Sequence, residues 1–142
     1  MTKSAYQHKR LPQWLKARLP RTRKFFQLKS LLKENGLNTV CESASCPNIG
    51  TCWDAGTLTF MILGDTCTRA CRFCDVPTGS LNQPDSNEPD KVALSLSRLD
   101  LKFAVITSVD RDDLPDGGAG HWVKTIAAIR SHCPEIKIEA LI

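Results

Sequence analysis

The sequence predicts an α/β protein in which strands and helices alternate along a parallel sheet. In the second half of its 142 residues, three short apolar segments are separated by two segments with helical spacing of apolar residues. The content of 42% hydrophobic and 24% charged residues is typical of a globular protein. No run reaches the roughly 18 apolar residues that a membrane span requires. These observations exclude fibrous and membrane-spanning classes. Seven cysteines, about 5% of the chain, are also fewer than the roughly 8–10% of a disulfide scaffold.

The chain begins with a basic segment that leads into a helix. Residues 1–33 contain ten Lys and Arg and no Asp or Glu. From Arg23 to Asn35, apolar residues recur at helical spacing, and Asn35-Gly36 is a typical helix end. The residues that define this spacing are Phe25, Leu28 and Leu32. We expect this helix to pack on the rest of the chain and to have no catalytic role.

The first strand and its crossover helix follow a cysteine-rich segment. Leu58–Leu63 is apolar except for Thr59 and is followed by Gly64, which indicates a buried strand. Pro89 then opens a helix through about Arg98. The apolar side of that helix is formed by Val92, Leu96 and Leu99.

The second half of the βαβαβ pattern is equally regular. Phe103–Thr107 and Ile136–Ile142 are apolar strands, and His121–His132 is a helix between them. Parallel strands joined in this way place their carboxyl ends at one edge of the sheet. The loop that contains Cys67 and the loop 108–118 should therefore meet there, where α/β proteins form their binding sites.

Six of the seven cysteines fall into two sets of three. The first set has C-x4-C-x5-C spacing and the second has C-x3-C-x2-C spacing. Their members are Cys41, Cys46 and Cys52, and Cys67, Cys71 and Cys74. Both sets lie in segments of small, polar and turn-forming residues, which we expect to be loops. The seventh, Cys133, is expected to be a packing residue.

Three close thiolates favour an iron–sulfur cluster over zinc. Thiolates select zinc, copper(I) or iron–sulfur clusters. Structural zinc usually takes four ligands as two close pairs, whereas only Cys71 and Cys74 form such a pair. A three-cysteine loop can hold three corners of a 4Fe–4S cube and leave the fourth iron for another ligand. A zinc-binding structural module and a two-cluster electron carrier remain alternatives.

Several segments resemble the lipoyl synthases of the radical S-adenosylmethionine superfamily. The C-x3-C-x2-C motif with Phe73 before its last cysteine is typical of the superfamily. The C-x4-C-x5-C set before it distinguishes the family, and the segments 35–41, 44–50, 60–67 and 107–118 are similar as well. The resemblance extends from about Leu11 to Ile142.

This resemblance implies two 4Fe–4S clusters and S-adenosylmethionine. Cys67, Cys71 and Cys74 would hold the cluster that binds the cofactor, and the first set would hold an auxiliary cluster that donates sulfur. The cofactor would generate a radical that removes hydrogen from carbons 6 and 8 of a protein-bound octanoyl group. The residues expected to contact the cofactor are Phe73, Thr107, Ser108 and Asp110. From composition alone, the acidic loop 110–116 is better explained as a solvated turn with a helix start.

The resemblance also implies partners and a division of the chain. The substrates would be octanoylated lipoyl-carrier domains of 2-oxoacid dehydrogenases or the glycine cleavage H protein. An electron donor such as ferredoxin or flavodoxin is expected in a cytoplasmic, more often bacterial, setting, with no nucleic acid or membrane partner. Residues 1–56 would form a cluster-binding extension, and residues 57–142 would form the first βαβαβ portion of a partial (β/α) barrel. We expect the chain to be an amino-terminal part of a longer enzyme and inactive alone.

Overall fold

A computed structural model describes residues 12, 19–99, 101 and 103–142. The strands β2 (Thr59–Ile62), β3 (Phe103–Ser108) and β4 (Lys137–Leu141) pair in parallel, as the sequence predicts. The short strand β1 (Asn38–Thr39) pairs antiparallel with β2. The sheet therefore has the order β1-β2-β3-β4 and is mixed.

The antiparallel edge is the one departure from the predicted parallel sheet. Two residues are too few to produce an alternating pattern, so nothing in the sequence indicated β1. Its residue Thr39 is only 1% exposed, and the pairing of Asn38 with Met61 protects one edge of β2.

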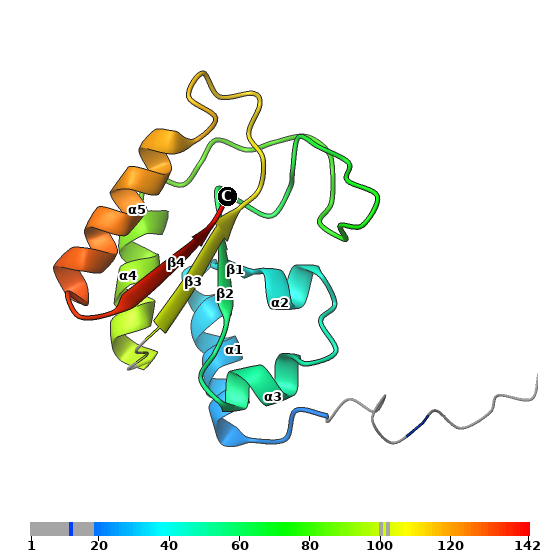
Figure 1. Ribbon diagram of the computed structural model, residues 1–142, viewed down its shortest axis with the longest axis vertical. Coiled ribbons are helices and arrows are strands. Elements are labelled where there is room, and N and C mark those ends of the chain that lie inside the picture. Colours follow the sequence, from blue (N-terminus) through cyan, green and yellow to red (C-terminus); the bar gives the residue numbers. More distant parts are fainter. Residues whose placement is uncertain (1–11, 13–18, 100, 102) are drawn as a thin grey trace, which may run out of the picture.

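Two long helices cover one face of the sheet. Helix α4 (Glu88–Leu99) joins β2 to β3, and α5 (Ala119–His132) joins β3 to β4. They lie side by side (Figure 1). Val92 and Leu96 of α4 and Ile129 of α5 are at most 1% exposed, because helical spacing turns these apolar residues toward the sheet.

Helix α1 (Arg23–Asn35) has the bounds predicted from its spacing. The hydroxyl of Thr22 accepts the backbone N–H of Phe25 at its start, and Gly36 ends it with φ +62°. That positive φ suits glycine, which has no Cβ to clash with the backbone. Phe25 and Leu32 join the core that also contains the sheet residues.

The first cysteine set is more ordered than the expected loop. Helix α2 (Val40–Ser43) carries Cys41, and helix α3 (Ile49–Asp54) carries Cys52. Thr39 starts α2 by accepting the backbone N–H of Glu42 at 3.2 Å. Helix α2 is one turn with this single cap, and α3 has six residues and no side-chain cap. Helices this short leave no periodic pattern, so the expectation of a loop was wrong here. Both helices lie on the side of the sheet away from α4 and α5 (Figure 1).

Within the part of the chain that the structure describes, no helix has the length and apolar character needed to cross a membrane.

Candidate functional site

Two loops meet at the carboxyl ends of β2 and β3, as the sequence predicts. The backbone N–H of Thr68 donates to the carbonyl oxygen of Asp110 at 3.1 Å, and the Thr68 hydroxyl donates to the same oxygen at 3.0 Å. Cys67 and Thr78 form an isolated parallel bridge, so the cysteine loop closes on itself beside this contact. The second cysteine set is thereby held against the loop that follows β3.

Cys67 is the anchored member of the second set. It is 8% exposed, and its Sγ accepts the backbone N–H groups of Arg69 at 3.4 Å and Asp110 at 3.3 Å. The Cys67 thiol also donates to Oδ2 of Asp110 at 3.8 Å. Hydrogen bonds from backbone N–H to sulfur are the kind that tune cluster-ligating thiolates. The loop after β3 therefore supplies a sulfur environment suited to a metal ligand.

An ion pair ties the same loop at its exposed side. Arg69 donates from Nε and Nη2 to the two carboxylate oxygens of Asp112 at 2.9 and 2.7 Å. These bonds, with one from the Thr68 hydroxyl, lower the pKa of Asp112 to about 2. The bond to Asp112, and the charge of Asp110, raise the pKa of Arg69. Both side chains therefore stay charged throughout the ordinary pH range, and the ion pair between Arg69 and Asp112 persists across it.

The other two thiols of this set are exposed. Cys74 donates its backbone N–H to the carbonyl oxygen of Cys71 at 3.0 Å, which forms a turn between them. Phe73, expected to pack by the cofactor, is 94% exposed and does not line the cavity that holds the other expected contact residues. The loop thus presents one anchored and two solvent-facing sulfurs.

The first set is only partly brought together. Cys41 and Cys46 line one open cavity of about 520 Å3, beside Phe25 and Phe26. The backbone N–H of Cys46 donates to the carbonyl oxygen of Cys41 at 3.1 Å. Cys52 is half-buried and packs against the hydrophobic core. Two of the three thiols therefore share a cavity that Cys52 does not line.

The segments that carry the two cysteine sets touch, although they are separate in the sequence. The hydroxyl of Ser45 donates to Oδ2 of Asp75 at 3.3 Å. These residues directly adjoin Cys46 and Cys74. Spacing along the chain carries no signal for this contact, because it depends on how α2 packs beside the sheet.

The donor chemistry fits clusters, although the sulfurs are not gathered. Among the described residues, no group of three or more His, Cys, Asp or Glu side chains has a geometry that could hold a metal ion. All seven cysteines are free thiols, and the soft donors come in threes from short segments. Thiolate sites commonly assemble together with their metal, because a preformed set of bare thiolates would repel itself. The side chains therefore suit the iron–sulfur groups that the sequence implies.

Three of the expected contact residues line a single cavity. Thr107, Ser108 and Asp110 border a space of about 510 Å3 at the carboxyl ends of β3 and β4, together with Trp122 of α5. The Ser108 hydroxyl accepts the indole N–H of Trp122 at 3.2 Å, and the Thr107 hydroxyl donates to the carbonyl oxygen of Leu141 at 2.8 Å. Asp110 has a half-exposed carboxylate that also contacts Cys67. The cavity thus adjoins the anchored thiol.

Asp116 in the same loop caps helix α5. Its carboxylate accepts the backbone N–H of Gly118 at 2.9 Å and of Gly120 at 2.8 Å. The donors at Gly120 and Gly118 hold the pKa of Asp116 below its usual range. This part of the acidic loop is accounted for by helix capping.

We expect Asp116→Asn to lose stability that depends on pH. A carboxyl whose pKa is lower in the folded state stabilises the fold above its unfolded pKa of about 4, and that stabilisation disappears as pH falls through the lower folded pKa. The difference in unfolding free energy between wild type and Asp116→Asn should therefore be largest at pH 7 and shrink below pH 4. Urea unfolding at pH 7, 5 and 3 measures it, and a difference independent of pH would contradict the capping role.

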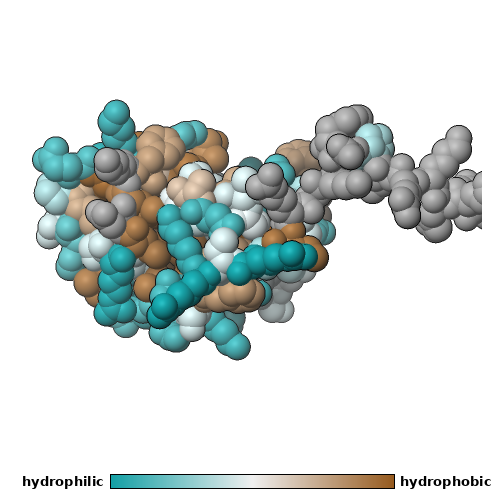
Figure 2. Space-filling model, turned by 90° about the horizontal axis from the view of Figure 1, so that it is seen from below, coloured by the Kyte–Doolittle hydropathy of each residue, from teal (hydrophilic) through white to brown (hydrophobic). Residues whose placement is uncertain are grey.

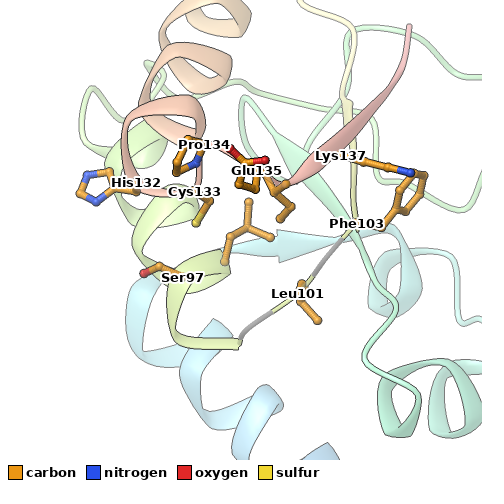
Figure 3. Close-up of a pocket in the computed structure, with 10 residues that line it drawn as sticks. Ser97, Leu101, Phe103, His132, Cys133, Pro134, Glu135 and Lys137 are labelled. Carbon is orange, nitrogen blue, oxygen red and sulfur yellow. The ribbon is translucent and has the colours of Figure 1, made fainter.

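Another cavity lies at the opposite end of the molecule. It measures about 800 Å3 and is lined from α4, α5 and the amino ends of β3 and β4 (Figure 3). Its wall includes Phe103 and Cys133. Figure 2 views this end and shows apolar side chains gathered on it. Because none of the six clustered cysteines and no residue of the loop after β3 lines it, this cavity is not part of the candidate site.

Sequence reasoning missed two buried charged residues near the site. Glu88 and Arg111 are 5% and 3% exposed, and both bind the backbone of Leu63 just before the cysteine loop. A charged residue next to a loop is ordinarily solvated, so neither stood out. Leu63 itself has φ +71°, which no sequence pattern indicated.

Comparisons with known proteins agree with these features. Residues 1–46 match a family model described as the N-terminal domain of lipoyl synthase of the radical SAM family. The lipoyl synthase of Methylobacillus flagellatus is 55% identical over 133 residues, which cover 94% of this chain and 41% of that protein. The lipoyl synthase of Methanocella arvoryzae is 57% identical over 132 residues, covering 92% of this chain and 45% of that protein. That of Neisseria gonorrhoeae is 55% identical over 131 residues, covering 92% and 40%.

The chain thus spans less than half the length of these curated relatives, and the matched region includes both cysteine sets and the loop after β3. A match of this length and identity, together with the two cysteine spacings, makes most of this chain similar to part of the known lipoyl synthases.

Proposed function

We propose that this chain contributes the two cluster-binding segments of a lipoyl synthase. The reaction is the insertion of two sulfur atoms at carbons 6 and 8 of a protein-bound octanoyl group. The relatives that this chain matches over part of their length are named lipoyl synthase. The observation that carries the proposal is the position of Cys67, which is anchored by backbone N–H groups beside the cavity of Thr107, Ser108 and Asp110.

We assign the second cysteine set to the cluster that binds S-adenosylmethionine. Cys67, Cys71 and Cys74 offer three thiolates, which leaves one iron of a 4Fe–4S cube for the cofactor. When bound, the cluster and S-adenosylmethionine supply the radical that removes hydrogen from the octanoyl chain. The residues of this chain orient the loop, exclude water from Cys67 and offer Asp110 as a carboxylate for a cationic or hydroxyl group.

We assign the first set to an auxiliary cluster that serves as sulfur donor. Cys41 and Cys46 share an open cavity, and Cys52 lies on the neighbouring helix α3. The contact between Ser45 and Asp75 holds the two cysteine segments next to each other. A donor cluster in this position would lie on the same side of the molecule as the second set, within reach of a common substrate.

The remaining parts of the proposal follow from the family. Residues 1–56 would be the cluster-binding extension, and residues 57–142 would be the first βαβαβ portion of a partial barrel. The mixed sheet with α4 and α5 on one face supports this, because barrel helices share one face. The partners would be octanoylated lipoyl-carrier domains and an electron donor such as ferredoxin or flavodoxin. Free thiols suit a reducing compartment such as the cytoplasm.

Metal analysis after anaerobic reconstitution tests the assignment. The chain should bind about eight iron and about eight sulfide ions, as two 4Fe–4S clusters require. S-adenosylmethionine should then change the spectrum of one cluster only. Binding of one or two zinc ions without sulfide would establish a structural module instead. Eight irons with no response to S-adenosylmethionine would favour an electron carrier.

A further inference from the structure

The residue that directly follows β2, Leu63, has both of its backbone polar groups bound by buried side chains. The N–H of Leu63 donates to Oε2 of Glu88 at 2.8 Å, and its carbonyl oxygen accepts Nη1 of Arg111 at 3.1 Å. All three residues are at most 5% exposed. One residue of the chain is thus bound by a buried carboxylate from α4 and a buried guanidinium from the loop after β3.

The residue bound by these two hydrogen bonds also has an unusual backbone conformation. Leu63 has φ +71°, in the left-handed region that L residues with a side chain rarely adopt. A Cβ at Gly118 would collide with Cδ1 of Leu63, so the start of α5 also packs directly on its side chain. Strained residues persist when several contacts over-determine them, and they concentrate at functional sites.

Both charged groups are fixed by further partners. Oε2 of Glu88 also contacts Nε2 of His121 on α5 at 2.6 Å, with both side chains at most 10% exposed. Arg111 forms a paired contact with Asp113 at 2.8 Å through Nε and Nη2 and donates to the carbonyl oxygen of Asn82 at 3.0 Å. The pair with Asp113 raises the pKa of Arg111, so it stays charged. A single network therefore joins α4, α5 and both loops of the candidate site.

We propose that Glu88 and Arg111 are positioning residues for the second cysteine set. They lock Leu63 in its left-handed conformation, which sets the direction in which the chain leaves β2 and so places Cys67 four residues later. Arg111 couples this to the neighbouring loop, because Asp110 donates its backbone N–H to Cys67 Sγ from the adjacent position. The inference rests on the proposed function for its purpose, but the lock itself is a property of the protein without metal.

The first test is amide hydrogen exchange of residues 64–70 in the metal-free chain. Glu88→Leu keeps a similar side-chain size but leaves the buried N–H of Leu63 without its acceptor, so exchange should accelerate at least about tenfold. Glu88→Gln keeps a carbonyl oxygen at that place and should restore protection to within about threefold of wild type. Leu96→Ala is the matched control, because it weakens the same helix about two turns away from Glu88.

The outcomes separate positioning from general stability. If Leu96→Ala lowers the melting temperature as much as Glu88→Leu but leaves exchange in 64–70 unchanged, the lock is specific. Equal acceleration in both variants, or none in Glu88→Leu, would overturn it. If Glu88→Leu does not fold, the same exchange measurement is made on Arg111→Lys, in which exchange of residues 64–70 should also accelerate. Lysine lacks the planar guanidinium needed to bind Leu63, Asn82 and Asp113 together.

A second measurement uses the reconstituted chain. Glu88→Leu should lose the spectral change that S-adenosylmethionine causes, whereas Glu88→Gln and Leu96→Ala should keep it. Retention of that change in Glu88→Leu would contradict a positioning role. If the wild-type chain bound no iron, the proposed function would be refuted. The exchange experiment would still test whether Glu88 and Arg111 hold Leu63 in its left-handed conformation.

Discussion

Replacement of Cys67 by alanine is expected to remove about half of the iron bound after reconstitution, roughly four of eight atoms. Cys67 is the one thiol of its set that is buried and held by two backbone N–H groups. The exposed thiols of Cys71 and Cys74 then have no anchored partner. The variant should also lose the whole spectral response to S-adenosylmethionine, because the cluster with the open iron is gone.

Two matched variants complete this experiment. Cys46→Ala should lose the other half of the iron and keep the response to S-adenosylmethionine, since it belongs to the first set. Cys133→Ala should keep both, because Cys133 lies beside the cavity at the opposite end of the molecule. Iron and sulfide analysis with absorption spectra measures all three. Loss of all iron in both Cys67→Ala and Cys46→Ala would show that the six thiols form one site rather than two.

Replacement of Trp53 by alanine is expected to cost about 3–5 kcal/mol of unfolding free energy. The side chain is fully buried at the end of α3, and its ring lies 5.0 Å from that of Phe25 on α1. Removal would leave a large cavity between the two helices that flank the first cysteine set. Because small domains have only about 5–15 kcal/mol of stability, this loss should be evident in urea unfolding.

Trp53→Phe distinguishes packing from hydrogen bonding. The indole N–H of Trp53 is buried and has no acceptor among the residues that the structure describes. Phenylalanine keeps a ring against Phe25 and removes this unsatisfied donor, so it should cost less than half as much as alanine. Equal destabilisation by the two variants would mean that the indole makes a polar contact that matters more than its packing.

The regular elements were predictable because their signal is local and repeated. Helix α1 was predicted at its observed bounds from the spacing of Phe25, Leu28 and Leu32 and from Gly36. The strands β2, β3 and β4 and the helices α4 and α5 were predicted in order, with ends within about two residues. Each has several apolar residues at one period, and parallel connection of β2 to β3 to β4 follows from that order.

The short elements could not be predicted in this way. Strand β1 has two residues, and α2 has four. Their existence depends on pairing with Met61 and on the cap at Thr39, neither of which is periodic. The segment of the first cysteine set was therefore expected to be a loop, whereas two of its cysteines lie on helices.

By itself, the sequence predicted which residues would hold a metal group and which family the chain resembles. The spacing of the cysteines is fixed by the order of residues along the chain. Three soft donors within a short segment favour one class of metal group whatever surrounds them. It also determined the βαβαβ order, because apolar periodicity decides which face of each element is buried.

Only the tertiary structure decided how those cysteines are held. The N–H bond from Asp110 to Cys67 joins residues 43 positions apart, and the contact of Ser45 with Asp75 joins residues 30 positions apart. The hydrogen bonds of Glu88 and Arg111 to the backbone of Leu63 span 25 and 48 positions. Such contacts arise when packing brings polar groups together away from water, where each buried donor must find an acceptor. The partners in these contacts are chosen by the fold as a whole, and local spacing has no means of recording them.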